Sequence, residues 1–248
     1  MTVYFIGAGP GDPDLITVKG QRLIRQCPVI LYAGSLVPAA VLEGHQAEQV
    51  IDSATLNLEQ IVEVLASAHA KGQDVARVHS GDPSLYGAIG EQIRELRTRG
   101  IPFQIIPGVT ATAACAAVLE AELTLPGISQ TVILTRYGDR SPMPEGEALA
   151  DLARHRATLA IHLGVRHLEK IVQALLPHYG PDCPAAVVYR ASWPDQAVAR
   201  GTLANLLAQA EALGCERSAL IVVGRVLGDE PFAASNLYRA GHAHLYRP

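Results

Sequence analysis

Residues 3–12 of this chain read Val3-Tyr4-Phe5-Ile6-Gly7-Ala8-Gly9-Pro10-Gly11-Asp12. An apolar run of strand length passes directly into a glycine-rich turn, where absent side chains let the backbone come close to a ligand. The arrangement recurs where Val75–His79 leads into Ser80–Gly87 and where Phe103–Ile106 leads into Pro107–Ala111. Because parallel sheets bind ligands at the carboxyl ends of their strands, these three turns together predict a binding site for a small polar ligand.

Strand-like apolar runs alternate with segments of helical period along the whole chain, which predicts an α/β fold with parallel sheets covered by helices. The clearest helix follows Asn57, where an apolar stripe recurs at helical spacing and stops at Gly72. Two later helices are expected, one stopping at Pro177 and one capped by Thr202. The pattern restarts past residue 120, so we predict two α/β domains, residues 1–120 and 121–248, with a linker near 120–130. The expected strands are Val3–Ile6, Val29–Tyr32, Gln49–Ile51, Val75–His79, Phe103–Ile106, Thr131–Thr135, Thr158–His162, Ala185–Tyr189 and Ala219–Val223.

The composition excludes several classes of protein. Hydrophobic residues make up 49% of the 248 residues and charged residues 18%, which is typical of a globular chain with a substantial core. A net charge of -4 without a basic run argues against nucleic-acid binding. Four scattered cysteines without a CxxC pair argue against a metal centre and fit a reduced cytoplasm. We expect no membrane span, because prolines and a glycine divide the uncharged stretch 101–119.

The first glycine turn departs from the dinucleotide fingerprint. The third glycine of GxGxxG would fall at Asp12, and Pro10 lacks an amide that could face a phosphate. A nicotinamide-dependent oxidoreductase therefore remains only as an alternative. Asp82 has two interpretations: a carboxylate that accepts hydrogen bonds from an ammonium or ribose, or a cap of the following helix. Asp12 is either a residue for proton handling or substrate positioning, or a turn carboxylate bonded to nearby amides.

Taken together, these blocks resemble the tetrapyrrole (corrin and porphyrin) methylases, which use S-adenosylmethionine. The likeness rests on Gly7–Asp12, Ser80–Gly87, Pro107–Ala111 and the closing run Ala219–Gly224, in order over most of the chain. Tyr32–Val37 and Arg136–Glu145 are similar to the branch that methylates C11 of precorrin-4. Uroporphyrinogen-III methylases carry an Asp-Arg pair after the Leu-Tyr, and this chain has Ala33-Gly34 at those positions.

The resemblance implies two α/β domains with the active-site cleft between them, a homodimer, and a cytoplasmic enzyme of cobalamin biosynthesis. It also implies a set of cofactor-binding residues: Pro10, Ser80, Gly81, Asp82, Leu85, Thr110 and Ala111 from the first domain, and Leu163 and Ala191 from the second. Arg136 and Arg140, beside a proline-rich loop, are the arginines expected to bind substrate carboxylates. Asp12 and Arg136 are the candidate catalytic residues.

A reduced tetrapyrrole is itself electron-rich at its ring carbons, so the expected chemistry needs alignment of donor and acceptor more than a protein nucleophile. No GxSxG motif is present to anchor a Ser/His/Asp arrangement. His79, on an apolar strand, is expected to be a hydrogen-bonded core residue. The alternatives within the family are methylation at another ring carbon or of a cobalt-precorrin. A non-catalytic tetrapyrrole-binding module is the alternative outside it.

Overall fold

A computed structural model describes residues 1–138 and 141–235. The chain packs as two compact units. Of the described residues, unit 1 contains Met1–Ala114 together with the short segment Ser192–Pro194, and unit 2 contains those of Cys115–Ala191 and those from Asp195 to Ser235. The boundary expected at residue 120 concerns domains that fold independently, and it stays a prediction.

Unit 1 is built on a five-stranded sheet in the order β3-β2-β4-β1-β5, and every neighbouring pair is parallel. The strand positions agree closely with those expected from the apolar runs. The strands are β1 (Val3–Gly7), β2 (Val29–Tyr32), β3 (Gln49–Asp52), β4 (Val75–His79) and β5 (Phe103–Ile106).

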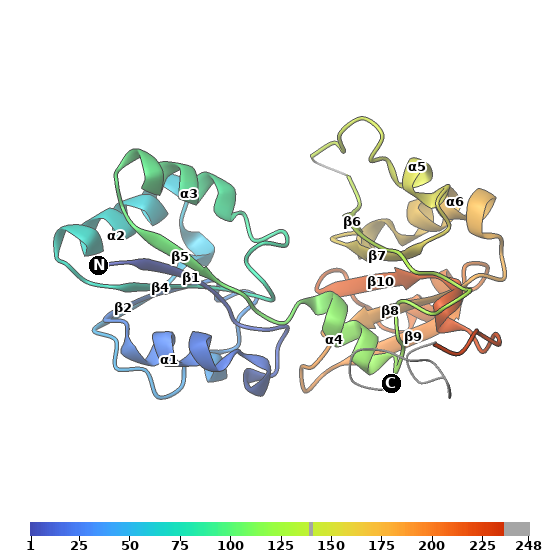
Figure 1. Ribbon diagram of the computed structural model, residues 1–248, viewed down its shortest axis with the longest axis horizontal. Coiled ribbons are helices and arrows are strands. Elements are labelled where there is room, and N and C mark those ends of the chain that lie inside the picture. The colour runs from blue at the N-terminus through green and yellow to red at the C-terminus, as the bar shows by residue number, and fades with distance from the viewer. Residues whose placement is uncertain (139–140, 236–248) are drawn as a thin grey trace, which may run out of the picture. The chain divides into compact units, whose positions relative to one another are not determined.

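Helices cover both faces of this sheet. Figure 1 shows α2 (Leu58–Ala70) and α3 (Ile89–Thr98) on one face and α1 (Val18–Gln26) on the other. The α2 helix begins as the sequence predicts, since Asn57 and Gln60 form a reciprocal capping box, and Gly72 follows its end at φ +70°. Apolar side chains of α2 and α3 pack on β1, β2 and β4 in a core that includes Phe5, Leu65 and Leu96.

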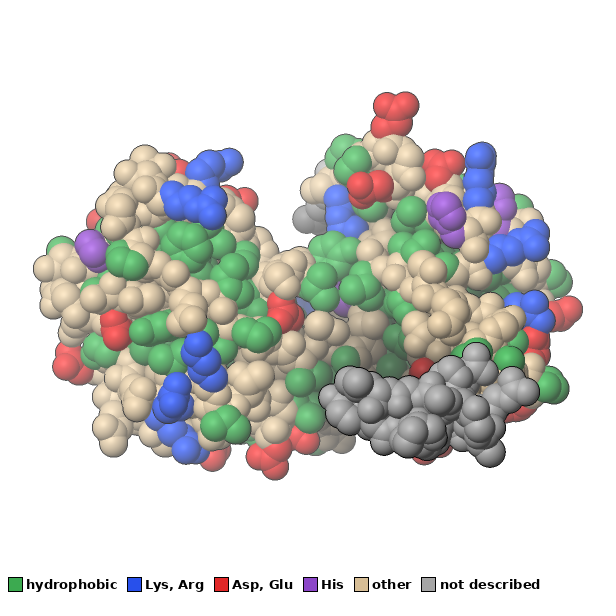
Figure 2. Space-filling view, viewed as in Figure 1, with side chains coloured by type: hydrophobic (Ala, Val, Ile, Leu, Met, Phe, Trp, Pro, Cys, Tyr) green, Lys and Arg blue, Asp and Glu red, His purple; other side chains and the backbone are tan. Residues whose placement is uncertain are grey.

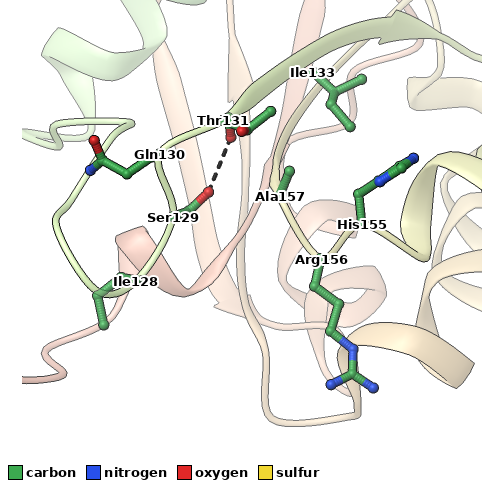
Figure 3. Close-up of a pocket in the computed structure, with 8 residues that line it drawn as sticks. All are labelled: Ile128, Ser129, Gln130, Thr131, Ile133, His155, Arg156 and Ala157. Carbon is green, nitrogen blue, oxygen red and sulfur yellow. Dashed lines mark hydrogen bonds between the residues drawn. The ribbon is translucent and has the colours of Figure 1, made fainter.

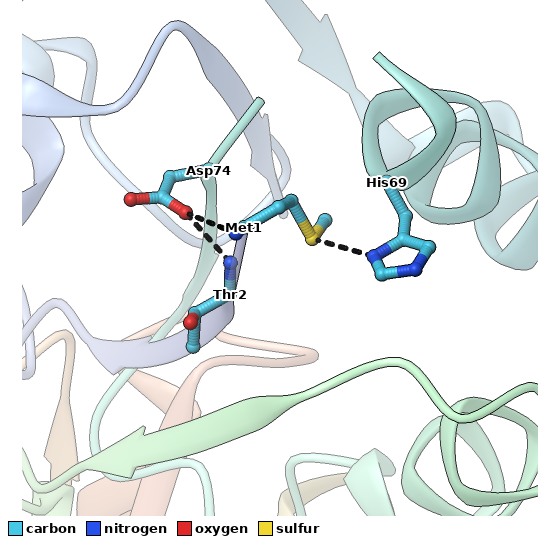
Figure 4. A network of polar contacts seen from close by, with 4 residues as sticks. All are labelled: Met1, Thr2, His69 and Asp74. Atoms are coloured by element: carbon cyan, nitrogen blue, oxygen red, sulfur yellow. Dashed lines mark hydrogen bonds and ion pairs between the residues drawn. The ribbon is translucent and has the colours of Figure 1, made fainter. Parts of the chain in front are cut away.

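The start of β1 is held by a carboxylate from the turn before β4 (Figure 4). Asp74 Oδ1 accepts a hydrogen bond from the Thr2 amide at 2.6 Å and lies 3.8 Å from the amino group of Met1. The Met1 sulfur lies 3.3 Å from Nδ1 of His69, on α2. These contacts hold the amino end of β1, an inner strand of the sheet, at the edge opposite the glycine turns.

Unit 2 contains a mixed sheet in the order β6-β7-β10-β8-β9, which corrects the expectation of a purely parallel pattern. Only β6 and β7 pair in parallel, while β10 runs antiparallel to both β7 and β8 and β9 runs antiparallel to β8. The strand β9 was not expected, because its short sequence AVARGT lacks an apolar run. The strands are β6 (Val132–Arg136), β7 (Thr158–His162), β8 (Pro184–Tyr189), β9 (Ala197–Thr202) and β10 (Ala219–Val223).

The helices of unit 2 end differently from the sequence prediction. The helix α6 (Leu168–Tyr179) continues through Pro177, which lies in its last turn, and Gly180 terminates it. Thr202 ends β9 and caps nothing, because α7 (Leu206–Glu211) begins after Asn205. Both helices, with α5 (Leu149–Ala153), contribute to one core against the sheet. A single helix, α4 (Ala111–Val118), links the β5 turn to unit 2.

Lys and Arg side chains on the face drawn in Figure 2 are scattered among acidic and uncharged groups. Within the described residues, none of the helices is both long and apolar enough to cross a membrane.

Replacing Leu96 with Ala tests the core of unit 1. Leu96 is fully buried between α3 and the sheet, so Leu96→Ala should lower the free energy of unfolding by about 2–5 kcal/mol through lost burial and a cavity. Urea unfolding followed by circular dichroism measures the change. The exposed Arg94→Ala on the same helix is the control and should stay within about 0.5 kcal/mol of the parent chain. Equal effects of the two changes would contradict this packing.

Candidate functional site

The strand order of unit 1 places the three glycine turns side by side. β1 lies between β4 and β5, and all three strands run in the same direction. The chain leaves β1 toward β2 on one side of the sheet, whereas it leaves β4 toward β5 on the other. A parallel sheet opens a crevice at such a reversal, outside the carboxyl ends of its strands. The expected juxtaposition of the three turns is therefore confirmed.

The turns approach so closely that side chains cannot stand between them. A Cβ built on Gly108 would lie 2.2 Å from the carbonyl oxygen of Gly81, and one built on Gly7 would lie 2.6 Å from the Cα of Gly108. Real Cβ atoms do not tolerate such distances, so the glycines at these positions are a steric requirement of the fold.

Backbone hydrogen bonds join the turns after β1 and β4. Gly81 donates its amide to the carbonyl of Gly9 at 2.7 Å, and Gly9 donates to the carbonyl of Gly81 at 3.3 Å. This pair forms an isolated antiparallel bridge beyond the ends of two parallel strands. The two turns are consequently a single rigid element.

Asp82 joins the turns after β4 and β5. Its Oδ2 accepts a hydrogen bond from the Gly108 amide at 2.8 Å, and its Oδ1 accepts from the Ser84 amide at 2.8 Å and from the Ser84 hydroxyl. Burial by itself would raise the pKa of this carboxyl, but the bonds from Ser84 and Gly108 outweigh it and lower the pKa below its ordinary 3.8. The interpretation of Asp82 as a cap of the next helix is wrong, because Ala88 occupies the N-cap position of α3.

Gly81 is buried and faces the start of α4, where a methyl group could be added without a clash. Gly81 has φ +63°, and a Cβ built there would meet nothing nearer than the Ala111 amide nitrogen at 3.9 Å and the Val109 carbonyl oxygen at 4.0 Å. Thr110 accepts a hydrogen bond from the Ala113 amide through its hydroxyl and so caps α4. Backbone donors and acceptors, a hydroxyl and a helix amino end are a donor set that suits a polar nucleoside with an amino-acid group.

The other first-domain candidates lie in the same turns. Pro10 is buried, while Ser80 and Leu85 are half-buried on either side of Gly81 and Asp82. Leu85 donates its amide to the carbonyl of Asp82, which closes the turn after β4. The structure thus places all seven first-domain candidates at one edge of the sheet of unit 1.

A fourth turn at this edge, Tyr32–Val37, follows β2. Ala33 donates its amide to the Val78 carbonyl at 3.2 Å, and Gly34 donates to Asp52 Oδ1 at 2.9 Å. A Cβ on Gly34 would lie 2.3 Å from the Asp52 carboxylate. This turn is therefore fixed by its neighbours, with the short side chain of Ala33 at the position that distinguishes the expected branch.

The two candidates from the second half of the chain belong to unit 2. Leu163 follows β7 at φ +54° with 70% of its side chain exposed, and Ala191 follows β8 and is buried. β7 and β8 run in the same direction on either side of β10, so both residues lie at the same edge of that sheet. Their role toward the cofactor stays a prediction from the family resemblance.

The candidate catalytic residues have local partners. Asp12 Oδ1 accepts the Asp14 amide at 2.9 Å and caps a short 3-10 helix (Pro13–Leu15). Arg136 donates to the backbone carbonyls of Tyr137 and Pro142, and to that of Ser141 at 3.0 Å. Arg136 therefore holds the loop after β6, which the sequence did not indicate. Arg140 lies outside the described residues.

Sequence reasoning missed the buried Arg77, which lies on β4 near the expected core residue His79. Arg77 donates to Gln92, to Ser53 and to the Leu31 carbonyl, and burial lowers its pKa to about 10. Burial, and then the charge of Arg77, lower the pKa of His79 to about 3, so its ring is neutral. His79 hydrogen bonds to the Gly87 backbone, as a core histidine should, but its Nε2 is buried without a partner among the described residues.

A cavity of about 440 Å³ in unit 2 lies away from the expected residues. Figure 3 shows its lining near the start of β6 and β7, with His155 and Arg156 on one side and Ser129 on the other. This edge of the sheet is opposite to Leu163 and Ala191, since those residues follow their strands. Within the described ranges, no group of three or more His, Cys, Asp or Glu side chains could hold a metal ion.

The turns of unit 1 carry the blocks on which the family resemblance rests, and a comparison with protein families agrees with it. A family model described as tetrapyrrole (corrin/porphyrin) methylases matches residues 2–207. The chain belongs to the tetrapyrrole methylase family. Membership favours a methylase over the nicotinamide-dependent alternative.

Individual tetrapyrrole methylases are similar over nearly the whole chain. A precorrin-4 C(11)-methyltransferase from Pseudomonas aeruginosa is 75% identical, and the match covers 100% of this chain and 99% of that protein. A crystal structure of a cobalt precorrin-4 methyltransferase is 43% identical with a TM-score of 0.89, covering 92% of this chain and 96% of that one. A uroporphyrin-III C-methyltransferase from Thermus thermophilus, solved with S-adenosylhomocysteine, is 31% identical with a TM-score of 0.74, covering 92% and 99%. The two-domain α/β architecture expected from the sequence is confirmed by these structures.

Replacing Asp82 with Asn tests the tie between the turns. The folded pKa of Asp82 lies below its ordinary 3.8, so its carboxylate stabilises the fold fully above that value, and the contribution is lost as the pH falls through the folded pKa. Asp82→Asn should therefore cost about 1–3 kcal/mol at neutral pH, and this difference should shrink below pH 3.8. Urea unfolding at a series of pH values measures it.

The exposed Asp14→Asn serves as the control and should change stability by less than about 0.5 kcal/mol. A cost of Asp82→Asn that is independent of pH would show that its charge does not stabilise the turns.

Proposed function

We propose that this chain transfers a methyl group from S-adenosylmethionine to C11 of precorrin-4, giving precorrin-5 in cobalamin biosynthesis. The identity of 75% over the full length of a precorrin-4 C(11)-methyltransferase carries this proposal. Ala33, in place of the Asp-Arg pair of uroporphyrinogen-III methylases, supports the same branch. Cobalt-precorrin-4 is the second candidate substrate, favoured by the structural likeness to a cobalt precorrin-4 methyltransferase.

S-adenosylmethionine supplies an electrophilic methyl group on sulfur and leaves as S-adenosylhomocysteine, while the methylated carbon skeleton gives up a proton. The residues that would hold it are those of the three tied turns, with Gly81, Thr110 and Ala111 where the turn after β4 faces the start of α4. The turns are fixed by Asp82 and by the glycine contacts, so little ordering is left to be done when the donor binds. This rigidity favours an aligned reaction without a protein nucleophile.

The candidate catalytic residues keep distinct proposed roles. Asp12 lies at the end of the first glycine turn, where a carboxylate could handle the departing proton or position the substrate. The proposed role of Arg136 is indirect: its guanidinium donates to carbonyls of the loop after β6, and so would hold that loop in place for the substrate. Leu163 and Ala191 complete the proposed set of cofactor-binding residues. A homodimer in the cytoplasm is proposed on the family resemblance alone.

Incubation with methyl-labelled S-adenosylmethionine tests the proposed reaction. With precorrin-4 or cobalt-precorrin-4 as acceptor, we expect one label per tetrapyrrole and its NMR signal at C11. Parallel reactions with the two acceptors identify the preferred form. Label at another ring carbon, or none in either reaction with folded protein, would contradict the proposal.

Substitution of Gly81 tests the proposed donor site. Gly81→Ala places a methyl group in van der Waals contact with the Ala111 amide and the Val109 carbonyl, where the proposed donor would lie, so the dissociation constant for S-adenosylhomocysteine should rise about tenfold or more, equivalent to about 1.4 kcal/mol. Isothermal titration calorimetry measures it. Gly72→Ala is the matched control, because Gly72 has a similar φ of +70° but follows α2 and has nothing within 4 Å. Both changes should cost about 1 kcal/mol of stability, and equal binding by the two variants would contradict the site.

A further inference from the structure

A short segment between β8 and β9 leaves unit 2 and packs in unit 1. The residues concerned, Ser192–Pro194, are flanked by an ion pair at 2.5 Å between Arg190 Nη1 and Asp195 Oδ2. Arg190 and Ser192 have φ values of +44° and +70°, which residues with side chains rarely adopt. Such strained positions persist only where surrounding contacts hold them, and they gather at functional sites. The contacts that hold this segment are therefore candidates for a functional role.

Trp193 contacts the first glycine turn directly. Its Nε1 donates a hydrogen bond to the Pro10 carbonyl at 2.8 Å. The indole ring lies against Gly11, where a built Cβ would come within 2.1 Å of the ring. At the residue after Gly11, the Asp12 amide donates a hydrogen bond to the Ser192 hydroxyl at 3.0 Å. Two hydrogen bonds and an aromatic ring thus fix the backbone from Pro10 to Asp12.

These contacts determine the orientation of one peptide group. The peptide between Pro10 and Gly11 is trans, so its carbonyl and its amide point in opposite directions. Because the carbonyl of Pro10 is directed at Trp193, the amide of Gly11 is directed away from the indole. The same turn is bonded through Gly9 to Gly81, which faces the Ala111 amide at the start of α4.

We propose that Trp193 is a positioning residue for the methyl-donor site: it orders the Pro10–Asp12 turn before the donor binds. This inference rests on the proposed function. The turn is rich in glycine, and a flexible binding loop weakens affinity because its ordering must accompany binding. The indole removes that requirement in advance, and it contributes an aromatic ring and a donor from a segment distant in the sequence.

Calorimetry with S-adenosylhomocysteine on two Trp193 variants tests the proposal. Trp193→Phe keeps a ring but loses the N–H, and its dissociation constant should rise about threefold to tenfold. Trp193→Ala loses both and should bind at least about tenfold more weakly. The matched control is Tyr179→Phe, which removes another aromatic donor to a backbone carbonyl, the 2.5 Å bond to Ala157 in unit 2. It should lower thermal stability without changing the dissociation constant.

A purely structural role would lower the melting temperature of both Trp193 variants and leave their dissociation constants unchanged, which would overturn the proposal. Failure of the unaltered chain to bind S-adenosylhomocysteine would instead reject the proposed function.

A second measurement needs no variant, because Trp193 is the single tryptophan of the chain. The proposal requires the indole to be ordered already in the unliganded chain, so its emission should be partly protected from the quencher acrylamide, and saturation with S-adenosylhomocysteine should leave the quenching nearly unchanged. An indole that acrylamide quenches freely in the unliganded chain, and that becomes protected only when S-adenosylhomocysteine binds, would show that the donor orders the turn. That result would overturn the proposal even if both variants fail to fold.

Discussion

Three turns of unit 1 touch backbone to backbone, and the rest of the proposed site depends on that contact. Gly7 and Gly108 lie closer to each other, and to the Gly81 carbonyl, than a side chain on either would allow. The parallel order β4-β1-β5 brings the strand ends to one edge, but only glycine lets the turns that follow them meet. The contact replaces side-chain packing with direct backbone packing at the carboxyl ends of the strands.

The Asp82 carboxylate stabilises this arrangement by satisfying amides that the glycine turns leave without partners in the sheet. It accepts from Gly108 across the turns and from Ser84 within its own turn. Buried amides without acceptors are costly, and charged acceptors form the stronger hydrogen bonds. The acidic residue that the sequence suggests as a ligand contact is therefore a structural tie between the turns after β4 and β5.

The sequence predicts the first unit more completely than the second, for physical reasons. In unit 1 the strands are short runs with Gly, Pro, Ser or Asp at or just after their ends, and α2 carries its own capping box at Asn57. In unit 2 the strand β9 pairs at the edge of the sheet with a half-polar sequence, so no local pattern marks it. The antiparallel placement of β10 is a property of tertiary pairing and leaves no trace in periodicity.

The same distinction applies to the site. Glycine spacing identifies the turns after β1, β4 and β5, because the steric requirement is local to each turn. Nothing local links Trp193 to Pro10, since the two are far apart in the chain and meet only through the fold. The hydrogen bond from Arg136 to the Ser141 carbonyl, in the loop after β6, likewise depends on tertiary geometry.

A crystal structure with S-adenosylhomocysteine bound would show whether the three tied turns hold the methyl donor. We expect the ligand in van der Waals contact with the Gly81 and Ala111 backbones, and the hydrogen bond from Gly108 to Asp82 intact. Ligand density confined to the cavity lined by His155 and Arg156, with the turns of unit 1 unoccupied, would contradict this expectation.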